Sequence, residues 1–141
     1  MSVLIRAFFR LLRALLAPAM WTWDHWPVSG KVRRTPEAQA RLDARTRGMA
    51  LYHFPTCPFC IRARRAMRRL GIRVELRDAR NDPAHRRELE EQGGKVQVPC
   101  LRIPGPAGDT WLYESSDIIR HCESLAAEVD GGARLPREAG A

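Results

Sequence analysis

Two cysteines separated by two residues carry the clearest chemistry in this sequence. Cys57 and Cys60 lie in the segment Phe54-Pro55-Thr56-Cys57-Pro58-Phe59-Cys60. The apolar, aromatic residues 50–54 come just before them and predict a short buried strand. Apolar side chains then recur at helical spacing, at Ile61, Ala66, Met67 and Leu70, and predict a helix. The pair therefore lies where a strand turns into a helix.

Cys57 is the predicted nucleophile of the pair. Pro58 suits the first position of a helix, where its missing N–H would have no partner, so Cys57 is the predicted N-cap. We expect its sulfur to lie near the free N–H groups of Phe59 and Cys60. Those donors and the helix dipole stabilise a thiolate. Cys60 follows one turn later, close enough to form a disulfide, and is the predicted resolving thiol.

The same spacing also occurs in zinc sites, which is the main alternative for these cysteines. Structural zinc usually takes a second pair of ligands at similar spacing. Cys100 and Cys122 stand apart, and only His121 adjoins one of them. We therefore predict no metal site and interpret both as small buried hydrophobic residues. His53 is interpreted as a strand-end side chain rather than as a general base.

The positive charge of the chain is uneven. The 141 residues carry a formal net charge of +8 and allow one domain with appendages. Residues 1–50 hold nine basic and three acidic side chains, and residues 51–141 hold fifteen and thirteen. No nucleic-acid recognition motif accompanies the arginines, so an anionic lipid surface is the simpler partner. Four cysteines with one close pair favour a reducing compartment over a secreted disulfide framework.

Residues 2–17 predict an amphipathic helix. At about 100° per residue, the arginines share one side of it and the large apolar residues the other: Arg6, Arg10 and Arg13 against Leu4, Phe8, Leu11 and Leu15. This segregation is typical of a helix that lies in a membrane interface, and three tryptophans follow within residues 21–26. The arginines and Pro18 argue against a cleaved signal peptide and a spanning helix.

We therefore expect residues 1–26 to hold the protein peripherally on the cytoplasmic side of a membrane. A single membrane span and a helix that packs on protein are the alternatives. Residues 27–49 are predicted as a basic linker, with a short helix that begins at Thr35-Pro36. Residues 124–141 contain few large apolar side chains and are predicted as a flexible tail.

Between these segments, residues 50–123 predict one α/β domain. Gly71 ends the helix that follows Cys57, and residues 72–77 alternate like a strand. Asn81-Asp82-Pro83 begins a helix that reaches about Gln92. Further strands are predicted at residues 96–103 and 110–113, and Glu114-Ser115-Ser116-Asp117 opens a helix to about Glu123. The order is β-α-β-α-β-β-α, which predicts a small mixed sheet with helices on its faces.

This arrangement resembles the thioredoxin fold, and its motifs are similar to two families of that fold. Cys57-Pro58-Phe59-Cys60 looks like the glutaredoxin signature, and Val98-Pro99 lies where glutaredoxins carry a cis-proline. Residues 93–99 and 113–119 are also similar to the glutathione-binding N-terminal domain of glutathione S-transferases. The resemblance covers residues 50–123.

The resemblance implies a glutathione site. Val98, turned by a cis Pro99, would offer its backbone to the cysteinyl part of glutathione. Ser115 and Ser116 would hold the γ-glutamyl carboxylate at a helix start, and Glu114 or Asp117 would meet the ammonium group. Lys95 would attract the glycyl carboxylate. Helix capping alone is the alternative role of residues 114–117.

The expected function is a glutathione-dependent thiol–disulfide oxidoreductase of the glutaredoxin type. It would reduce protein disulfides or glutathione mixed disulfides through Cys57 and Cys60. The alternative is a non-catalytic module that binds glutathione or a [2Fe–2S] cluster, or a membrane-tethered adaptor. Nucleic acid is not an expected partner.

Overall fold

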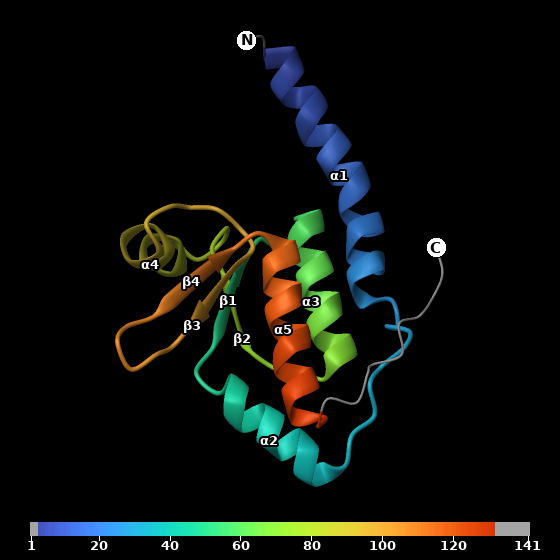
Figure 1. Ribbon diagram of the computed structural model, residues 1–141. Coiled ribbons are helices and arrows are strands. Elements are labelled where there is room, and N and C mark those ends of the chain that lie inside the picture. Colours follow the sequence, from blue (N-terminus) through green and yellow to red (C-terminus); the bar gives the residue numbers. More distant parts are fainter. Residues whose placement is uncertain (1–2, 132–141) are drawn as a thin grey trace.

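The computed structural model describes residues 3–131 of the chain (Figure 1). Its helices are α1 (Val3–His25), α2 (Pro36–Thr46), α3 (Pro58–Leu70), α4 (Pro83–Gly93) and α5 (Ser115–Val129). Its strands are β1 (Ala50–His53), β2 (Glu75–Asp78), β3 (Cys100–Ile103) and β4 (Thr110–Tyr113). The predicted order of elements from residue 50 onward is confirmed.

The four strands form one mixed sheet in the order β2-β1-β3-β4. β1 runs parallel to β2 and antiparallel to β3, and β4 runs antiparallel to β3. Tyr52, Cys100 and Tyr113 lie side by side in this register. The carboxyl ends of β1 and β4 and the amino end of β3 therefore meet at one edge of the sheet. The connections that leave this edge lead to Cys57, Pro99 and Ser115.

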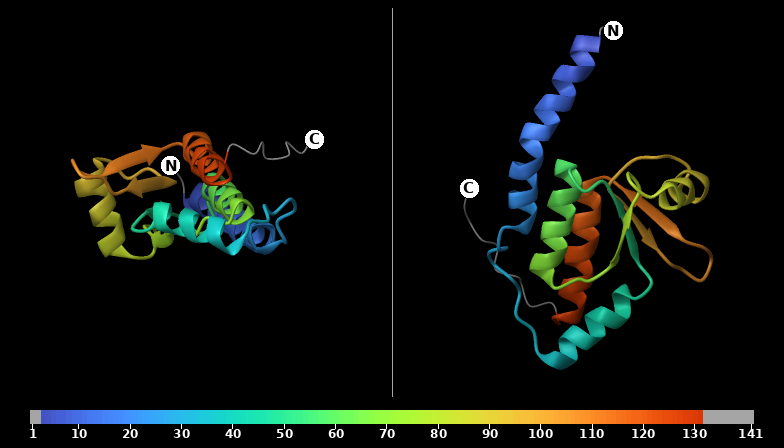
Figure 2. Two further views of the ribbon diagram at one scale, coloured as in Figure 1. Left: turned by 60° about the horizontal axis from the view of Figure 1, so that its bottom comes forward. Right: turned by 180° about the vertical axis from the view of Figure 1, so that it is seen from behind.

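The two faces of the sheet bury alternate residues of the same strands. Leu51 and Leu101 face a core formed by α2, α3 and α5. Tyr52 and Cys100 face the opposite side, where they pack with Leu89 of α4. Figure 2 shows α3 and α5 beside each other on one face and α4 on the other. This is the α/β, thioredoxin-like fold that the resemblance implied.

The last helix is longer than expected. We predicted its end near Glu123 and a flexible tail from residue 124, but α5 continues to Val129. Leu125, Ala126 and Val129 are buried in the main core. Their spacing continues the helical pattern that begins at Ile118, although the composition of the segment had suggested a tail. The remainder of the predicted tail, residues 132–141, lies outside the described residues.

The predicted linker contains a helix that belongs to the domain. Thr35 caps α2 as expected, and its hydroxyl accepts a hydrogen bond from the backbone N–H of Ala38. Leu42 of α2 is fully buried in the main core. Arg34, just before α2, pairs with Asp130 after α5 at 2.7 Å. The segment is therefore a packed part of the domain rather than a free linker.

Two strands begin later than predicted. β2 starts at Glu75 rather than at residue 72, because the N–H of Ile72 still bonds to Met67 at the end of α3. β3 starts at Cys100, and residues 95–99 form an irregular loop that ends in a cis peptide bond between Val98 and Pro99. A proline N has no hydrogen to give to a strand ladder, so the ladder begins after it.

Helix α1 continues past Pro18 to His25, within the residues 1–26 expected to form the N-terminal helix. Its second half lies along α3, and its first half extends beyond the domain (Figure 1). An interior proline costs about 3 kcal/mol, and contacts with α3 offset this cost. Asp24 pairs with Arg64 and Arg68, both at 2.8 Å. Among residues 3–131, no helix combines the length and apolar character needed to cross a bilayer.

Candidate thiol site

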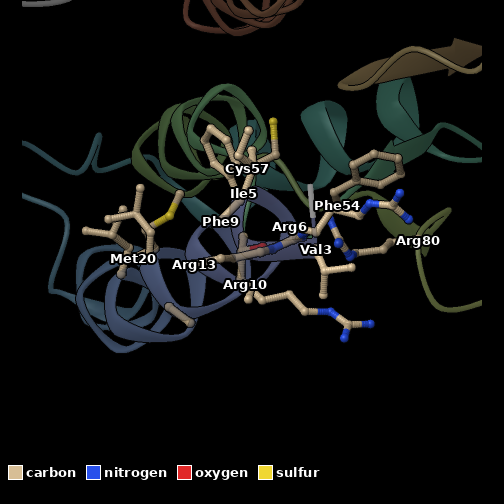
Figure 3. Close-up of a pocket in the computed structure, with 15 residues that line it drawn as sticks. Val3, Ile5, Arg6, Phe9, Arg10, Arg13, Met20, Phe54, Cys57 and Arg80 are labelled. Carbon is tan, nitrogen blue, oxygen red and sulfur yellow. The ribbon is translucent and has the colours of Figure 1, made fainter. Parts of the chain in front are cut away.

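Cys57 occupies the predicted N-cap of α3, with Pro58 at the first helical position. Its backbone N–H donates to Phe54 at 3.1 Å, and its carbonyl accepts the helical N–H of Ile61 at 2.9 Å. The Cys57 side chain makes no capping hydrogen bond, so the expected bonds from the N–H groups at the helix start to its sulfur are absent. The partly exposed side chain instead lines a groove between α1 and the turn before α3 (Figure 3).

Cys60 lies one turn further along α3 and is fully buried. Its sulfur accepts a weak hydrogen bond from the N–H of Phe54 at 3.5 Å. Burial raises the pKa of the Cys60 thiol to about 12, and the neighbouring sulfur of Cys57 acts in the same direction. Cys60 is therefore a protonated thiol at neutral pH, and Cys57 is the thiol of the pair that solvent reaches.

The two remaining cysteines are confirmed as small buried groups. Cys100 in β3 and Cys122 in α5 are both buried, on opposite faces of the sheet. Burial raises the pKa of Cys100 to about 11 and that of Cys122 to about 12. Within residues 3–131, no three His, Cys, Asp or Glu side chains gather as ligands of a metal ion.

A buried arginine packs against the turn of residues 54–57, here called the thiol turn. This arginine is the residue that the sequence analysis missed. The Arg64 guanidinium is within 2.7 Å of His53 Nδ1, donates to the Pro55 carbonyl at 3.0 Å and pairs with Asp24. Its position three residues after Ile61 puts it on the buried helical face, and this spacing was the available signal.

His53 is buried at the end of β1, as interpreted. Burial and the charge of Arg64 lower the pKa of His53 to about 4. The imidazole is therefore neutral at physiological pH, and its Nδ1 accepts the hydrogen bond from Arg64. Arg64, which bonds to His53, also donates to the Pro55 carbonyl, so His53 helps to position the thiol turn.

The loop before β3 is held in place by a tyrosine. Tyr113 Oη lies 2.9 Å from the carbonyl of Gly93 and 3.2 Å from that of Lys95. The ammonium group of Lys95 lies 4.5 Å from the centre of the Tyr113 ring. This arrangement fixes the start of the loop that carries Val98 and the buried Pro99. Lys95 itself remains exposed beside it.

The start of α5 combines a strained backbone with exposed polar groups. Glu114 has a φ of 71°, a region that non-glycine residues rarely adopt. Its side chain makes no capping bond and instead accepts a hydrogen bond from Gln97 at 3.1 Å. Ser115 is buried at the first helical position and Ser116 is exposed. Asp117 pairs with Arg120 in the same helix.

These observations gather the predicted residues at one edge of the sheet. Cys57 and Cys60 follow β1, Lys95, Val98 and Pro99 precede β3, and residues 114–116 follow β4. The antiparallel register brings these three connections together, since Tyr52 and Tyr113 both pair with Cys100. The fold thus places an accessible thiol beside a loop and a helix start that both carry polar groups.

The comparisons with known proteins agree with this geometry. The family described as glutathione S-transferase, N-terminal domain, matches residues 51–130, which is more than half of the chain. The match begins within β1 and ends just after α5. Comparisons with curated proteins and with solved structures gave no match. The chain therefore belongs to the glutathione S-transferase N-terminal domain family and is a glutathione-related protein of the thioredoxin fold.

Proposed function

We propose that the protein is a glutathione-dependent thiol–disulfide oxidoreductase that acts on protein disulfides or glutathione mixed disulfides. One observation carries the proposal: a partly exposed free thiol, Cys57, begins α3 one turn before a second, buried thiol, Cys60. Membership in a family whose domains bind glutathione supports the choice of reductant. The dipole of α3 favours negative charge at the position of Cys57.

In the first step, the thiolate of Cys57 attacks one sulfur of the substrate disulfide. A new S–S bond forms between Cys57 and that sulfur, the original S–S bond breaks, and the other sulfur leaves as a thiolate that takes a proton from water. For a glutathionylated protein, attack on the glutathione sulfur releases the protein thiol and leaves glutathione on Cys57. The enzyme sulfur is oxidised and the substrate sulfur is reduced.

Two routes complete the turnover. Where glutathione is bound to Cys57, a thiolate of free glutathione attacks the bound glutathione sulfur, releases the Cys57 thiolate and forms oxidised glutathione. Alternatively, Cys60 attacks Cys57, passes its proton to the departing thiolate and forms the Cys57–Cys60 disulfide, which two glutathione molecules then reduce. Burial raises the pKa of Cys60 to about 12, which disfavours its thiolate, so we expect small mixed disulfides to turn over through free glutathione.

The residues at the sheet edge suit the three parts of glutathione. The backbone of Val98 beside Pro99 is proposed to pair with the cysteinyl part as a short added strand. Ser115 and Ser116 at the start of α5 are proposed to hold the γ-glutamyl carboxylate, where helix N–H groups favour an anion. Glu114 would receive the ammonium group.

Lys95 is the proposed partner of the glycyl carboxylate of glutathione. Its ammonium group is exposed, and within residues 3–131 it forms no ion pair with a carboxylate. The neighbouring Tyr113 ring holds it near the loop of Val98.

The same proposal places the protein on the cytoplasmic surface of a membrane through α1. On one side of α1, Leu4, Phe8, Leu11 and Leu15 form a stripe in which each residue is 60–79% exposed. No element of the described chain covers this stripe, and burial of large apolar side chains in a lipid interface is favourable. A reducing compartment suits four free cysteines.

The redox test uses a mixed disulfide of glutathione with a small thiol, supplied with glutathione and glutathione reductase. Wild type is compared with Cys57→Ser, Cys60→Ser and the buried-thiol control Cys122→Ser. We expect Cys57→Ser to lose at least about a hundredfold in rate, and Cys60→Ser and the control to keep most of it. Unchanged turnover in Cys57→Ser would rule out the proposed enzyme activity. Visible absorbance after purification without oxygen would instead favour a [2Fe–2S] module.

The membrane test is sedimentation with vesicles that contain anionic lipid. Leu11→Gln combined with Leu15→Gln should abolish binding, and Leu76→Gln, a matched change at an exposed leucine of β2, should not. Equal binding by all three proteins would contradict the assignment of α1. Sedimentation velocity without lipid shows whether the stripe instead joins two copies of the chain.

A further inference from the structure

A groove of about 900 Å³ separates α1 from the thiol turn. Figure 3 shows Ile5, Arg6 and Phe9 of α1 on one side of it and Phe54, Cys57 and Arg80 on the other. None of the residues proposed to contact glutathione lines it. Cys57 therefore stands between two surfaces, the sheet edge with its polar groups and this groove.

The orientation of α1 determines which of its side chains line the groove. At about 100° per residue, the outward stripe of Leu4, Phe8, Leu11 and Leu15 lies opposite the lining of the groove. Arg6, Arg10 and Arg13 all line the groove, together with Phe9 and Leu16. The sequence analysis assigned these arginines to the polar face of a membrane helix. In the structure, that face is turned toward the thiol.

The groove thus combines apolar walls with unpaired positive charge. Its apolar lining comes from both sides, from Phe9 and Leu16 of α1 and from Phe54 of the turn. Four arginines, Arg6, Arg10, Arg13 and Arg80, stand around it, and no ion pair among residues 3–131 involves any of them. The guanidinium of Arg80 lies 5.7 Å from the centre of the Phe54 ring.

We infer that this groove binds a long-chain carboxylate, with its hydrocarbon chain between α1 and the turn and its carboxylate against the arginines. The volume lies in the range of small-molecule sites, about 300–1,000 Å³. Guanidinium groups pair with a carboxylate through two parallel hydrogen bonds, which suits an anionic head. The ligand chain would cover Cys57 from the side away from the glutathione contacts.

A hydrocarbon chain fits this groove better than a peptide does. The wall contributed by α1 is helical, so its backbone N–H and C=O groups are already bonded within the helix. A bound peptide would bury its backbone N–H groups against apolar side chains and arginines, a lining that offers few hydrogen-bond acceptors. An alkyl chain has no such groups and needs only the apolar walls.

The test measures binding of cis-parinaric acid, a fluorescent long-chain carboxylate, to the full chain in solution without vesicles. Oleate should displace the probe, and methyl oleate and oleylamine, which lack the negative charge, should do so at least about tenfold less well. Arg6→Gln combined with Arg13→Gln should weaken probe binding about tenfold. Arg86→Gln combined with Arg87→Gln, at exposed arginines of α4, should leave it unchanged.

A second measurement places the ligand beside the thiol. Bound oleate should slow alkylation of Cys57 by iodoacetamide several-fold in wild type and not in the Arg6→Gln, Arg13→Gln variant. Equal displacement by methyl oleate, wild-type probe binding in that variant, or unprotected Cys57 would each overturn the inference. Neither measurement requires turnover, so their outcome is independent of the redox proposal. Leu11→Gln with Leu15→Gln should keep probe binding, which separates the groove from the membrane face.

Discussion

Arg64 of α3 joins Asp24 of α1 to the thiol turn: its Nη2 lies 2.8 Å from the Asp24 carboxylate and 3.0 Å from the Pro55 carbonyl. Both side chains of the ion pair are largely buried, with 5% and 13% of their surface exposed. One guanidinium thus holds the N-terminal helix and the segment that leads to Cys57. The position of α1 and the geometry of the thiol turn are therefore coupled through this residue.

The first prediction concerns Asp24→Asn. The change leaves Arg64 without its charge partner, although the guanidinium keeps its hydrogen bond to the Pro55 carbonyl. Removing one member of a buried pair costs several kcal/mol, and we expect a loss of about 2 kcal/mol in the free energy of unfolding because α1 can detach. Urea denaturation measures it. Glu128→Gln, which breaks the exposed pair with Arg45, should stay within about 0.5 kcal/mol. Equal effects of the two changes would contradict the coupling.

The second prediction is a loss of stability in mild acid caused by His53. Burial, then the charge of Arg64, lowers the pKa of His53 from 6.5 to about 4 in the folded protein. Between these values the unfolded chain binds more protons, so stability is complete above pH 6.5 and falls as the pH drops toward 4. We expect His53 to remove about 2 kcal/mol over this interval. Urea denaturation across the interval should show a weaker pH dependence in His53→Gln than in the exposed control His25→Gln.

The sequence predicted those parts of the fold that local signals determine. Pro58 after Cys57, Pro36 after Thr35 and Pro83 after Asp82 each marked the start of a helix, and all three starts are confirmed. These signals are local because a cap and a first-turn proline act within one helical turn.

The parts that were wrong depend on tertiary contacts. The extension of α5 to Val129 and the packing of α2 both require the shared core, and composition alone suggested a tail and a linker. Arg64 was missed because a buried arginine is explained only by its partners on other elements, Asp24 and Pro55. The groove likewise depends on how α1 lies against α3, which no local pattern determines.

The third prediction is selective alkylation of one cysteine. Cys57 is the only partly exposed cysteine of the four, since the other three are at most 1% exposed. Burial also raises the pKa of Cys60 to about 12. Brief treatment with iodoacetamide near neutral pH, followed by peptide mass spectrometry, should modify Cys57 alone. Modification of Cys60 at a similar rate would show that the turn opens and would contradict its role as a shielded second thiol.

The fourth prediction tests whether α2 is part of the domain. Leu42 is fully buried in the core shared with α5. Leu42→Ala should therefore cost about 2–4 kcal/mol of unfolding free energy, through lost burial and the cavity left behind. Arg41→Ala, at the exposed neighbouring position of the same helix, should cost less than about 0.5 kcal/mol. A small effect at Leu42 would mean that α2 is a detachable linker after all.

The last prediction separates strain from function at Glu114. Its φ of 71° costs a non-glycine residue about 1–3 kcal/mol, whereas glycine adopts it freely. Glu114→Gly should therefore raise the free energy of unfolding by about 1 kcal/mol, after the entropy that glycine adds to the unfolded chain. Glu114→Gln keeps the strain and should leave stability almost unchanged. If the carboxylate meets the ammonium group of glutathione, both variants should lose about tenfold in kcat/KM for glutathione. A variant that gains stability and keeps full affinity for glutathione would assign Glu114 a purely local role in the turn before α5.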